Sequence, residues 1–308
     1  MRVAVTGATG MIGRALVSAL CECGDQPVAL VRDADRARHA LGEEVEIHLW
    51  PDPKQALPPA VALDGADAVV HLLGEPVAQR WTKQARREIR DSRVLGTRSL
   101  VAGLDALSPA RRPGILVSQS ATGYYGPRDE EPVREDAAAG EDFLADVTSA
   151  WEHEALAAAE LPGLRVALTR TGMVLSPHGG ALAKMLPPFR LGLGGPVAGG
   201  RQYVSWVHLD DVVGALRHCL AEPRAAGPVN VTAPNPVTNA GLSRALGRVL
   251  RRPAVLPVPA AALRLLYGEM AVIVVTGQRV LPARLQELGY RFRHPEPDPA
   301  LRDVLGRA

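Results

Sequence analysis

The strongest constraint on the fold is a glycine triplet close to the N-terminus. Residues 1–6 ("MRVAVT") form a short β-branched run, and Gly7, Gly10 and Gly13 follow at intervals of three. The next stretch, "MIGRALVSALCECG", has the apolar spacing of a helix that ends at Gly24. A strand, a glycine-rich turn and a helix in this order predict a dinucleotide-binding unit.

Each glycine of the triplet has an expected role in such a unit. Gly7 allows the tight turn, Gly10 lets the backbone approach a pyrophosphate, and Gly13 lets helix and strand pack closely. The pyrophosphate would lie on the free N–H groups at the helix start. The predicted cofactor contacts are the residues of this turn, together with two at the end of the fourth strand: Gly7, Thr9, Gly10, Met11, Ile12, Gly13, Leu73 and Gly74. A purely structural glycine turn is the alternative.

The rest of the chain alternates predicted strands and helices. After the first strand, further strands are expected at residues 27–33, 45–52, 66–74, 114–123 and 164–175, and long helices at 82–107 and 141–159. This alternation predicts an α/β fold with a Rossmann-type, doubly wound parallel sheet covered on both faces. We place the dinucleotide-binding domain at residues 1–225, with an inserted Gly/Pro-rich substrate loop at 177–202 that contains one short helix. Residues 226–308 are expected to form a smaller α+β substrate lobe.

The end of the second predicted strand indicates which dinucleotide is bound. An NAD-binding chain usually has an acidic residue there to bind the ribose 2′-hydroxyl. Here the position is Val31, and Arg32 follows it. An arginine pairs well with a 2′-phosphate, so we expect NADP(H) in preference to NAD(H). Asp33 complicates this prediction, and a solvent-exposed Arg32 without a ligand is the alternative.

Composition excludes several other classes of protein. The 308 residues include 35 Lys+Arg and 33 Asp+Glu, so we expect no nucleic-acid partner. Its three cysteines, Cys21, Cys23 and Cys219, lack the spacing of a metal site, and we expect no metal. Unpaired thiols are typical of a reducing compartment, which predicts a cytoplasmic protein. No signal peptide or apolar run long enough for a membrane span is expected.

Several longer motifs carry a family resemblance. They are "GEPVAQRWTKQARREIRDSRVLGT" (74–97), "SATGYYG" (120–126), "RTGMVLSPHGGALAKMLPPFRLGLGGP" (170–196), "GRQYVSWVHLDD" (200–211), "APNPVTN" (233–239) and the closing "GQRVLPARLQELGYRF". With them the chain resembles an atypical extended short-chain dehydrogenase/reductase, of the "epimerase family protein" or nucleoside-diphosphate-sugar epimerase-like branch. The resemblance covers nearly the whole chain. It implies a Rossmann core, NADP(H) binding and a C-terminal domain of unknown function, and it names no settled substrate.

The chain departs from the catalytic tetrad that the wider superfamily implies. Ser120 matches the active-site serine, but the Tyr-x-x-x-Lys positions fall on Leu144 and Thr148. Arg93 stands where the superfamily has asparagine. An unperturbed tyrosine has a pKa of about 10, and the missing lysine is the group that would lower that pKa. The usual proton transfer therefore cannot be assumed.

Other side chains are candidates for the missing chemistry. Tyr124 would replace the lost tyrosine, and Tyr125 would contact the substrate; packing beneath the loop is the alternative for both. Arg93 would stabilise an oxyanion, or else pair with Glu152 or Asp91. Three further side chains are predicted to contact the substrate, with the alternatives of helix capping for the histidine and solvation for the others: Lys184, Arg201 and His208.

Two interpretations of function remain open on the sequence. The first is an NADP(H)-dependent oxidoreductase or epimerase that acts on a small, anionic substrate, such as a nucleotide sugar, or on a small carbonyl compound. The second is a non-catalytic NADP(H)-binding redox sensor that presents its C-terminal lobe to a protein partner. The resemblance also implies a homodimer formed through the helices at 82–107 and 141–159.

Overall fold

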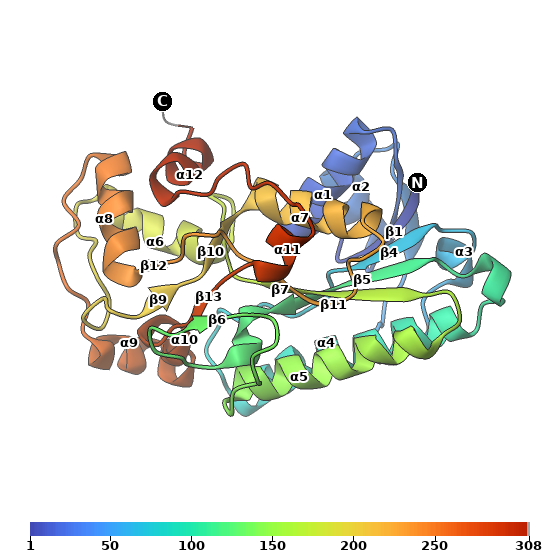
Figure 1. Cartoon of the computed structure of the whole chain (residues 1–308), viewed down its shortest axis with the longest axis horizontal. Helices are drawn as coiled ribbons and strands as arrows, with labels where there is room; N and C mark the ends of the chain where they lie inside the picture. Colours follow the sequence, from blue (N-terminus) through green and yellow to red (C-terminus); the bar gives the residue numbers. More distant parts are fainter. Residues whose placement is uncertain (307–308) are drawn as a thin grey trace.

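A seven-stranded parallel sheet forms the centre of the molecule (Figure 1). The computed structural model describes residues 1–306. The strand order is β11-β7-β5-β4-β1-β2-β3, which confirms the predicted doubly wound topology. The strands are β1 (Arg2–Thr6), β2 (Gln26–Val31), β3 (Glu46–Leu49), β4 (Ala68–His71), β5 (Ile115–Ala121), β7 (Arg165–Thr171) and β11 (Gly227–Val231).

Helices cover both faces of this sheet because its strands are apolar on both sides. On one face α1 (Met11–Glu22), α2 (Ala34–Leu41) and α7 (Leu209–Ala221) pack on side chains such as Val3 and Val5. On the other face α3 (Ala60–Leu63), α4 (Lys83–Asp105) and α5 (Phe143–Leu156) pack on side chains such as Ala4 and Leu30. The expected helices at 82–107 and 141–159 are thus confirmed as α4 and α5.

The strand expected at 164–175 is two strands in the structure. β7 ends at Thr171, and β8 (Met173–Leu175) leaves the main sheet to pair with β10 (Trp206–His208). Gly172 lies between them, where an added Cβ would overlap the Ser205 carbonyl oxygen. The close approach of these two backbones redirects the chain, and a pattern of apolar residues along one segment does not reveal it.

The smaller lobe is built from separated segments of the chain. A core of buried side chains joins α6 (Gly180–Arg190), α8 (Asn239–Leu250) and α12 (Pro297–Val304). The lobe's other elements are β9 (Tyr203–Val204), β12 (Val237–Thr238), α9 (Ala260–Tyr267) and α10 (Val272–Val275). Further short elements are β6 (Pro132–Val133), β13 (Arg279–Val280) and the 3-10 turns η1 (Pro109–Arg111), η2 (Thr122–Tyr125), η3 (Ala157–Glu160) and η4 (Gly268–Ala271).

The predicted domain boundary at residue 225 is therefore wrong in two respects. β11, at residues 227–231, is the edge strand of the main sheet and belongs to the Rossmann domain. The segment 177–202, expected as an insertion in that domain, supplies α6 to the core of the smaller lobe. The reason is non-local packing, because apolar faces distant in the sequence are buried against one another.

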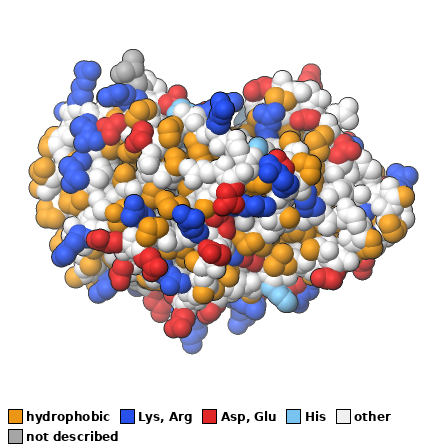
Figure 2. Space-filling model, viewed as in Figure 1, with side chains coloured by type: hydrophobic (Ala, Val, Ile, Leu, Met, Phe, Trp, Pro, Cys, Tyr) orange, Lys and Arg blue, Asp and Glu red, His pale blue; other side chains and the backbone are white. Residues whose placement is uncertain are grey.

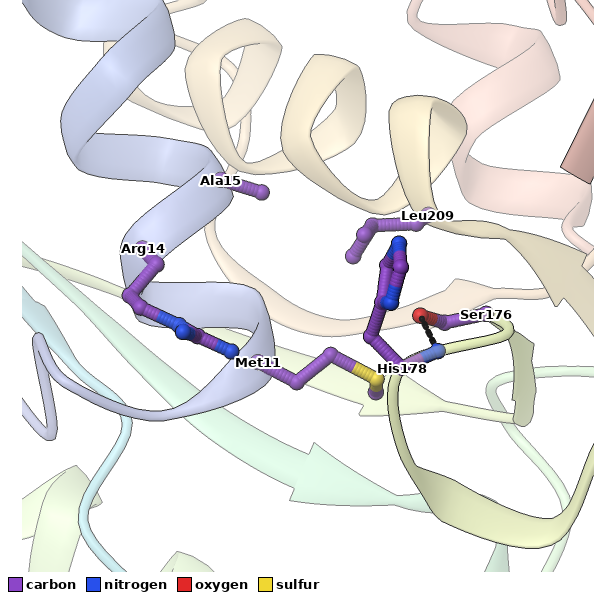
Figure 3. Close-up of a pocket in the computed structure, with 6 residues that line it drawn as sticks. All are labelled: Met11, Arg14, Ala15, Ser176, His178 and Leu209. Carbon is purple, nitrogen blue, oxygen red and sulfur yellow. Dashed lines mark hydrogen bonds between the residues drawn. The ribbon is translucent and has the colours of Figure 1, made fainter. Parts of the chain in front are cut away.

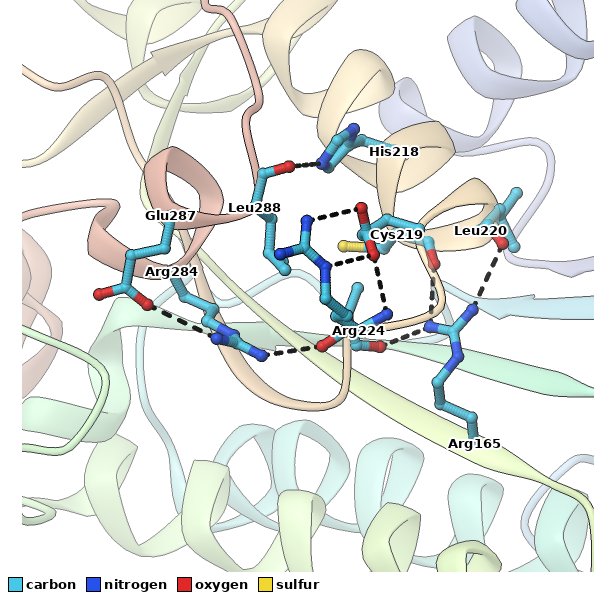
Figure 4. A network of polar contacts seen from close by, with 10 residues as sticks. Arg165, His218, Cys219, Leu220, Arg224, Arg284, Glu287 and Leu288 are labelled. Carbon is cyan, nitrogen blue, oxygen red and sulfur yellow. Dashed lines mark hydrogen bonds and ion pairs between the residues drawn. The ribbon is translucent and has the colours of Figure 1, made fainter.

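The C-terminal segment returns to the Rossmann domain before the chain ends. α11 (Ala283–Glu287) lies beside β11, and Leu285 and Leu288 join the core of the main sheet. Arg284 donates a hydrogen bond to the Arg224 carbonyl oxygen, and the His218 ring contacts the Leu288 carbonyl oxygen (Figure 4). These contacts hold α11 against the Rossmann domain. Within residues 1–306, no helix has the length and apolar character needed to cross a membrane.

Candidate functional site

The glycine turn has the close contacts that its spacing predicts. Gly7 has a φ of +65°, and an added Cβ there would lie 2.6 Å from the Leu72 carbonyl oxygen, at the end of β4. An added Cβ at Gly13 would overlap the backbone of Gly7 and Ala8. Gly7 therefore allows close approach to β4 as well as the turn, and Gly13 lets α1 pack on that turn.

The start of α1 is open to a ligand. Gly10 is its N-cap residue, and within residues 1–306 no side-chain hydrogen bond caps the first amides of the helix. Thr9, Met11 and Ile12 are half-buried, and Gly10 is exposed. A helix start with free amides suits a pyrophosphate, as the sequence predicts.

A cavity of about 500 Å³ lies beside this helix start (Figure 3). It is lined by Met11, Arg14, Ala15, Ser176, His178 and Leu209. The loop after β8 closes one side of it, since an added Cβ at Gly179 would lie 3.4 Å from the Met11 Sδ. The first residues of the predicted substrate loop therefore reach the helix expected to bind the cofactor.

The end of β2 holds the two charged residues that bear on the choice of dinucleotide, Arg32 and Asp33. Arg32 is exposed, and no ion pair or hydrogen bond within residues 1–306 involves its side chain. The Asp33 side chain caps α2 by accepting a hydrogen bond from the Arg36 amide at 3.0 Å. The Asp33 carboxylate thus has a local partner, and the Arg32 side chain is free to bind a phosphate.

Arg93 forms none of the expected ion pairs. Its Nη1 donates to the carbonyl oxygens of Glu75 (3.0 Å) and Ile89 (2.9 Å), and its guanidinium lies 5.2 Å from the centre of the Trp151 ring. Burial lowers its pKa to about 10, which leaves it charged at neutral pH. An added Cβ at Gly74 would lie 3.0 Å from this guanidinium, so Gly74 gives Arg93 its space at the end of β4.

Ser120 is part of a buried network that the sequence did not predict. Its Oγ donates to Glu152 Oε1 at 2.5 Å, and the Ser120 residue has no exposed surface. Arg170 Nε and Nη2 donate to the two oxygens of Glu152, each at 2.8 Å. Burial alone would lower the pKa of Arg170, but the bonds and charge of Glu152 raise it above its usual value. The catalytic role expected of Ser120 stays a prediction; in this structure its hydroxyl is covered and bonded to Glu152.

Tyr125, which was predicted to contact the substrate, is packed into the same network. The residue has no exposed surface, and its hydroxyl donates to Asn230 Oδ1 at 2.6 Å while accepting from Arg170 Nη1 at 3.0 Å. Burial raises its pKa to about 12. The packed alternative holds for this tyrosine, and the partners that decide it come from β7 and β11.

Tyr124 differs from its neighbour. It is half-buried in η2, directly after β5, and its ring lies 3.5 Å from the Arg170 guanidinium. Within residues 1–306 its hydroxyl has no hydrogen-bond partner. Tyr124 thus combines a free hydroxyl with a fixed cation beneath its ring.

Leu144 and Thr148, the residues at the expected tyrosine and lysine positions of the sequence, lie beside η2. An added Cβ at Gly123 would meet Leu144 Cβ at 3.4 Å and Thr148 Oγ1 at 3.8 Å, so both residues face η2. The Thr148 hydroxyl donates to the Leu144 carbonyl oxygen at 2.6 Å. Neither side chain titrates near neutral pH, so these positions provide no proton donor.

The predicted substrate residues Lys184 and Arg201 are both exposed. Lys184 Nζ donates to the Ala78 carbonyl oxygen at 2.5 Å, which joins α6 to the loop between β4 and α4. Arg201 has no ion pair within the described chain, and it follows Gly199 and Gly200, whose φ angles are positive. The two cations are therefore on the smaller lobe, with Lys184 directed at the Rossmann domain.

His208 caps the start of α7. Its Nδ1 accepts from the Asp210 amide at 3.1 Å, so His208 is the N-cap of α7, which is the capping role given as its alternative. Its ring stacks on His294 at 3.8 Å, and its Nε2 lies 3.2 Å from Asp303 Oδ2. Burial, followed by the charge of His294, lowers its pKa. The capping alternative thus describes His208 in this structure, where its ring is buried, and the substrate contact stays a prediction.

Four groups of the kind that bind metals meet at this place. One ligand atom each of His208, Asp210, His294 and Asp303 lies within 4.8 Å of the others. His208 Nδ1 accepts an amide proton, which leaves the ring's own proton on Nε2 in the neutral form. The rings of His208 and His294 are stacked with 27° between their planes, and the nitrogen lone pairs lie in those planes. Both facts favour a cap and a packing contact over a metal centre.

Comparisons with known proteins agree with this geometry. The NAD dependent epimerase/dehydratase family matches residues 3–232, and a domain of unknown function, DUF1731, matches residues 258–304. A chloroplastic epimerase family protein SDR39U1 homolog from Arabidopsis thaliana is 41% identical over 316 residues, covering 99% of this chain and 87% of the relative.

Two solved structures share the whole fold. Human epimerase family protein SDR39U1, solved with NADPH, has a TM-score of 0.88 and 32% identity, and the match covers 100% of both chains. A nucleoside-diphosphate sugar epimerase from Corynebacterium glutamicum has a TM-score of 0.78 and 32% identity, covering 99% of this chain and 58% of that one. The chain therefore belongs to the NAD(P)-binding NAD-dependent epimerase/dehydratase family and has a C-terminal DUF1731 domain.

Proposed function

We propose that the chain is an NADP(H)-dependent oxidoreductase or epimerase. The open amides of α1, the glycine turn and the exposed Arg32 support cofactor binding, and the human relative was solved with NADPH. Because Asp33 caps α2, no free carboxylate competes with the 2′-phosphate at this position. We infer a preference for NADP(H) over NAD(H) from this pair of residues.

Tyr124 is the residue that we assign to proton transfer, and its free hydroxyl is the observation that carries the proposal. A bound nicotinamide would supply or accept the hydride. A phenol at the carboxyl end of β5 lies where ligands enter sheets of this type. The Arg170 guanidinium, held by Glu152, lies under the Tyr124 ring and would stabilise negative charge on its oxygen. Arg93 would serve as a fixed positive charge near the reacting carbonyl.

For the substrate we propose a small carbonyl compound or a nucleotide sugar. Lys184 and Arg201 on the smaller lobe would pair with its negative charges. The Corynebacterium relative is described as a nucleoside-diphosphate sugar epimerase, which supports this class. The three free cysteines agree with a reducing compartment, and we retain the cytoplasm as the proposed location although the plant relative is described as chloroplastic.

A second candidate is a redox sensor that binds NADP(H) without turning a substrate over. Leu144 and Thr148 at the tetrad positions, and the covered hydroxyl of Ser120, favour it. Both candidates share the cofactor site, so the cofactor and the reaction need separate tests.

The cofactor test compares NADPH and NADH binding by fluorescence titration. Arg32→Ala should weaken NADPH binding by about 10- to 100-fold, since a hydrogen bond to a charged group contributes about 1.5–3 kcal/mol. NADH binding should be unchanged. The matched control is Arg38→Ala, which removes another exposed arginine that pairs with Asp35 and Glu43. Equal loss of both nucleotides, or loss of neither, would contradict the assigned preference.

The reaction test follows NADPH oxidation with a panel of carbonyl compounds and nucleotide sugars. With any compound that is turned over, Tyr124→Phe should lower kcat by about 10²- to 10⁴-fold, the usual contribution of a general acid or base. Its NADPH affinity and thermal midpoint should stay unchanged, because the lost hydroxyl has no partner in the described chain. Tight NADPH binding with no turnover across the panel would favour the sensor.

A further inference from the structure

The outer end of the smaller lobe has basic residues and almost no acidic ones. No acidic residue occurs between Glu160 and Asp210, or between Glu222 and Glu269, although these stretches contain five and six Lys or Arg residues. The helices α6, α8 and α9 all fall within them. Figure 2 shows basic and hydrophobic side chains alternating along the left-hand edge of the molecule, where Figure 1 places α8. This end therefore attracts anionic groups.

The arginines surround a groove at the C-terminal end of α8. The groove measures about 510 Å³ and is lined by Arg244, Gly247, Arg248, Arg251, Arg252, Pro253, Ala254 and Val255. Arg248 is neutralised, because it binds both oxygens of Asp298 at 2.9 and 2.7 Å. The side chains of Arg244, Arg251 and Arg252 have no ion pair or hydrogen bond within residues 1–306. The groove thus presents three guanidinium groups without a counter-charge.

The backbone at the groove is held in an unusual conformation. Arg251 ends α8 with a φ of 55°, a left-handed conformation that strains residues with a side chain. Glycine is the usual residue at such a helix end. An arginine here places a cation at the groove at some cost to the fold, which is the kind of strain found at binding sites.

Exposed aliphatic side chains adjoin the arginines. Val255 is 73% exposed, and Leu191 and Leu193 are 73% and 57% exposed. The two loops that hold them lie together, because the Leu256 amide donates to the Gly194 carbonyl oxygen at 3.2 Å. Large aliphatic side chains exposed beside unpaired cations mark a contact surface better than either does alone.

We propose that this groove binds an acidic segment of a partner protein that also carries apolar side chains. Carboxylates of the segment pair with Arg244, Arg251 and Arg252, and its apolar residues cover Val255 and Leu191. The cations lie around an open groove of about 510 Å³ with exposed aliphatic side chains beside it, which suits a segment that carries both carboxylates and apolar groups. The site lies on the smaller lobe, and its occupation does not depend on turnover of a substrate.

The test uses the full chain and a fluorescein-labelled synthetic helical peptide with Glu on one face and Leu on the other. Fluorescence anisotropy measures its binding at low salt. The groove variant is Arg244→Gln/Arg251→Gln/Arg252→Gln. The matched control, Arg38→Gln/Arg87→Gln/Arg90→Gln, makes the same change of charge at exposed positions of the Rossmann domain. Thermal unfolding checks that each variant is folded.

The proposal expects the wild type and the control to bind alike and the groove variant to bind at least about tenfold more weakly, because paired interfacial charges are lost. A second variant, Leu191→Ser/Val255→Ser, should also weaken binding. No binding by the wild type, or equal binding by the groove variant and the control, would overturn it. Sedimentation with phosphatidylserine vesicles provides a further arm. Groove-dependent binding to vesicles without groove-dependent binding to the peptide would replace the proposal with a membrane contact.

Discussion

Removal of the Glu152 carboxylate is the most direct test of the buried network under Tyr124. In the wild type this carboxylate accepts from Ser120 Oγ and from two nitrogens of Arg170. Arg170 is 2% exposed and Glu152 is 5% exposed, so water replaces neither partner. Glu152→Ala would leave the Arg170 guanidinium with only the Tyr125 hydroxyl and the Glu135 carbonyl oxygen as acceptors.

The expected cost follows from this burial. Removing one partner of a buried ion pair lowers the free energy of unfolding by about 3–5 kcal/mol, because the remaining charge is desolvated without compensation. Glu154→Ala is the control on the same helix. Glu154 pairs with Arg98, whose side chain is 61% exposed, so that change should cost only about 0.2–1 kcal/mol.

Urea denaturation followed by circular dichroism measures both values. The double variant Glu152→Leu/Arg170→Met removes both charges and should be more stable than Glu152→Ala, since apolar replacements of a buried pair are often tolerated. A loss below about 1 kcal/mol for Glu152→Ala would refute the reasoning, because that value is typical of an exposed pair. So would a double variant no more stable than the single one.

Three further predictions concern other parts of the molecule. Burial lowers the pKa of His71, which lies between Thr6 and Thr97, to about 3. Only the unfolded chain then binds a proton at His71 between about pH 6.5 and 3. The free energy of unfolding should therefore decrease as the pH is lowered through this range, by up to about 1.4 kcal/mol per pH unit, and His71→Asn should reduce that slope. Equal slopes for the wild type and the variant in urea titrations would contradict this. Burial raises the pKa of the Cys219 thiol to about 12, so a thiol reagent should modify the exposed Cys21 and Cys23 in the native protein and Cys219 only after unfolding. We also expect a homodimer through α4 and α5, and a monomer by light scattering at micromolar concentration would exclude it.

Much of the Rossmann domain was predictable because its signals are local. The glycine triplet, the alternation of strands and helices, and the long helices α4 and α5 follow from spacing within single segments. The close contacts at Gly7 and Gly13 agree with the roles expected from their positions. Family membership was also recognisable from motifs that extend along the chain, and it is confirmed by the matches at residues 3–232 and 258–304.

The candidate site was predictable only in part. The sequence distinguished Ser120, Tyr124 and Tyr125 from their neighbours, but it did not indicate which hydroxyl is free. That depends on Glu152, Arg170 and Asn230, which come from other strands and helices. The one local signal that could have revealed the network was Arg170, a charged residue within a predicted buried strand, because a buried charge needs a partner.

The amino-acid sequence by itself determined the parallel sheet, the cofactor turn and the family, because glycine positions and apolar periodicity act over a few residues. Tertiary structure alone decided that β11 joins the main sheet, that α6 joins the smaller lobe, and that His208 is buried against His294. It also decided which of the two adjacent tyrosines keeps a free hydroxyl. The physical reason is the same in each case: burial and hydrogen-bond partners are set by segments far apart in the chain, and no short pattern specifies them.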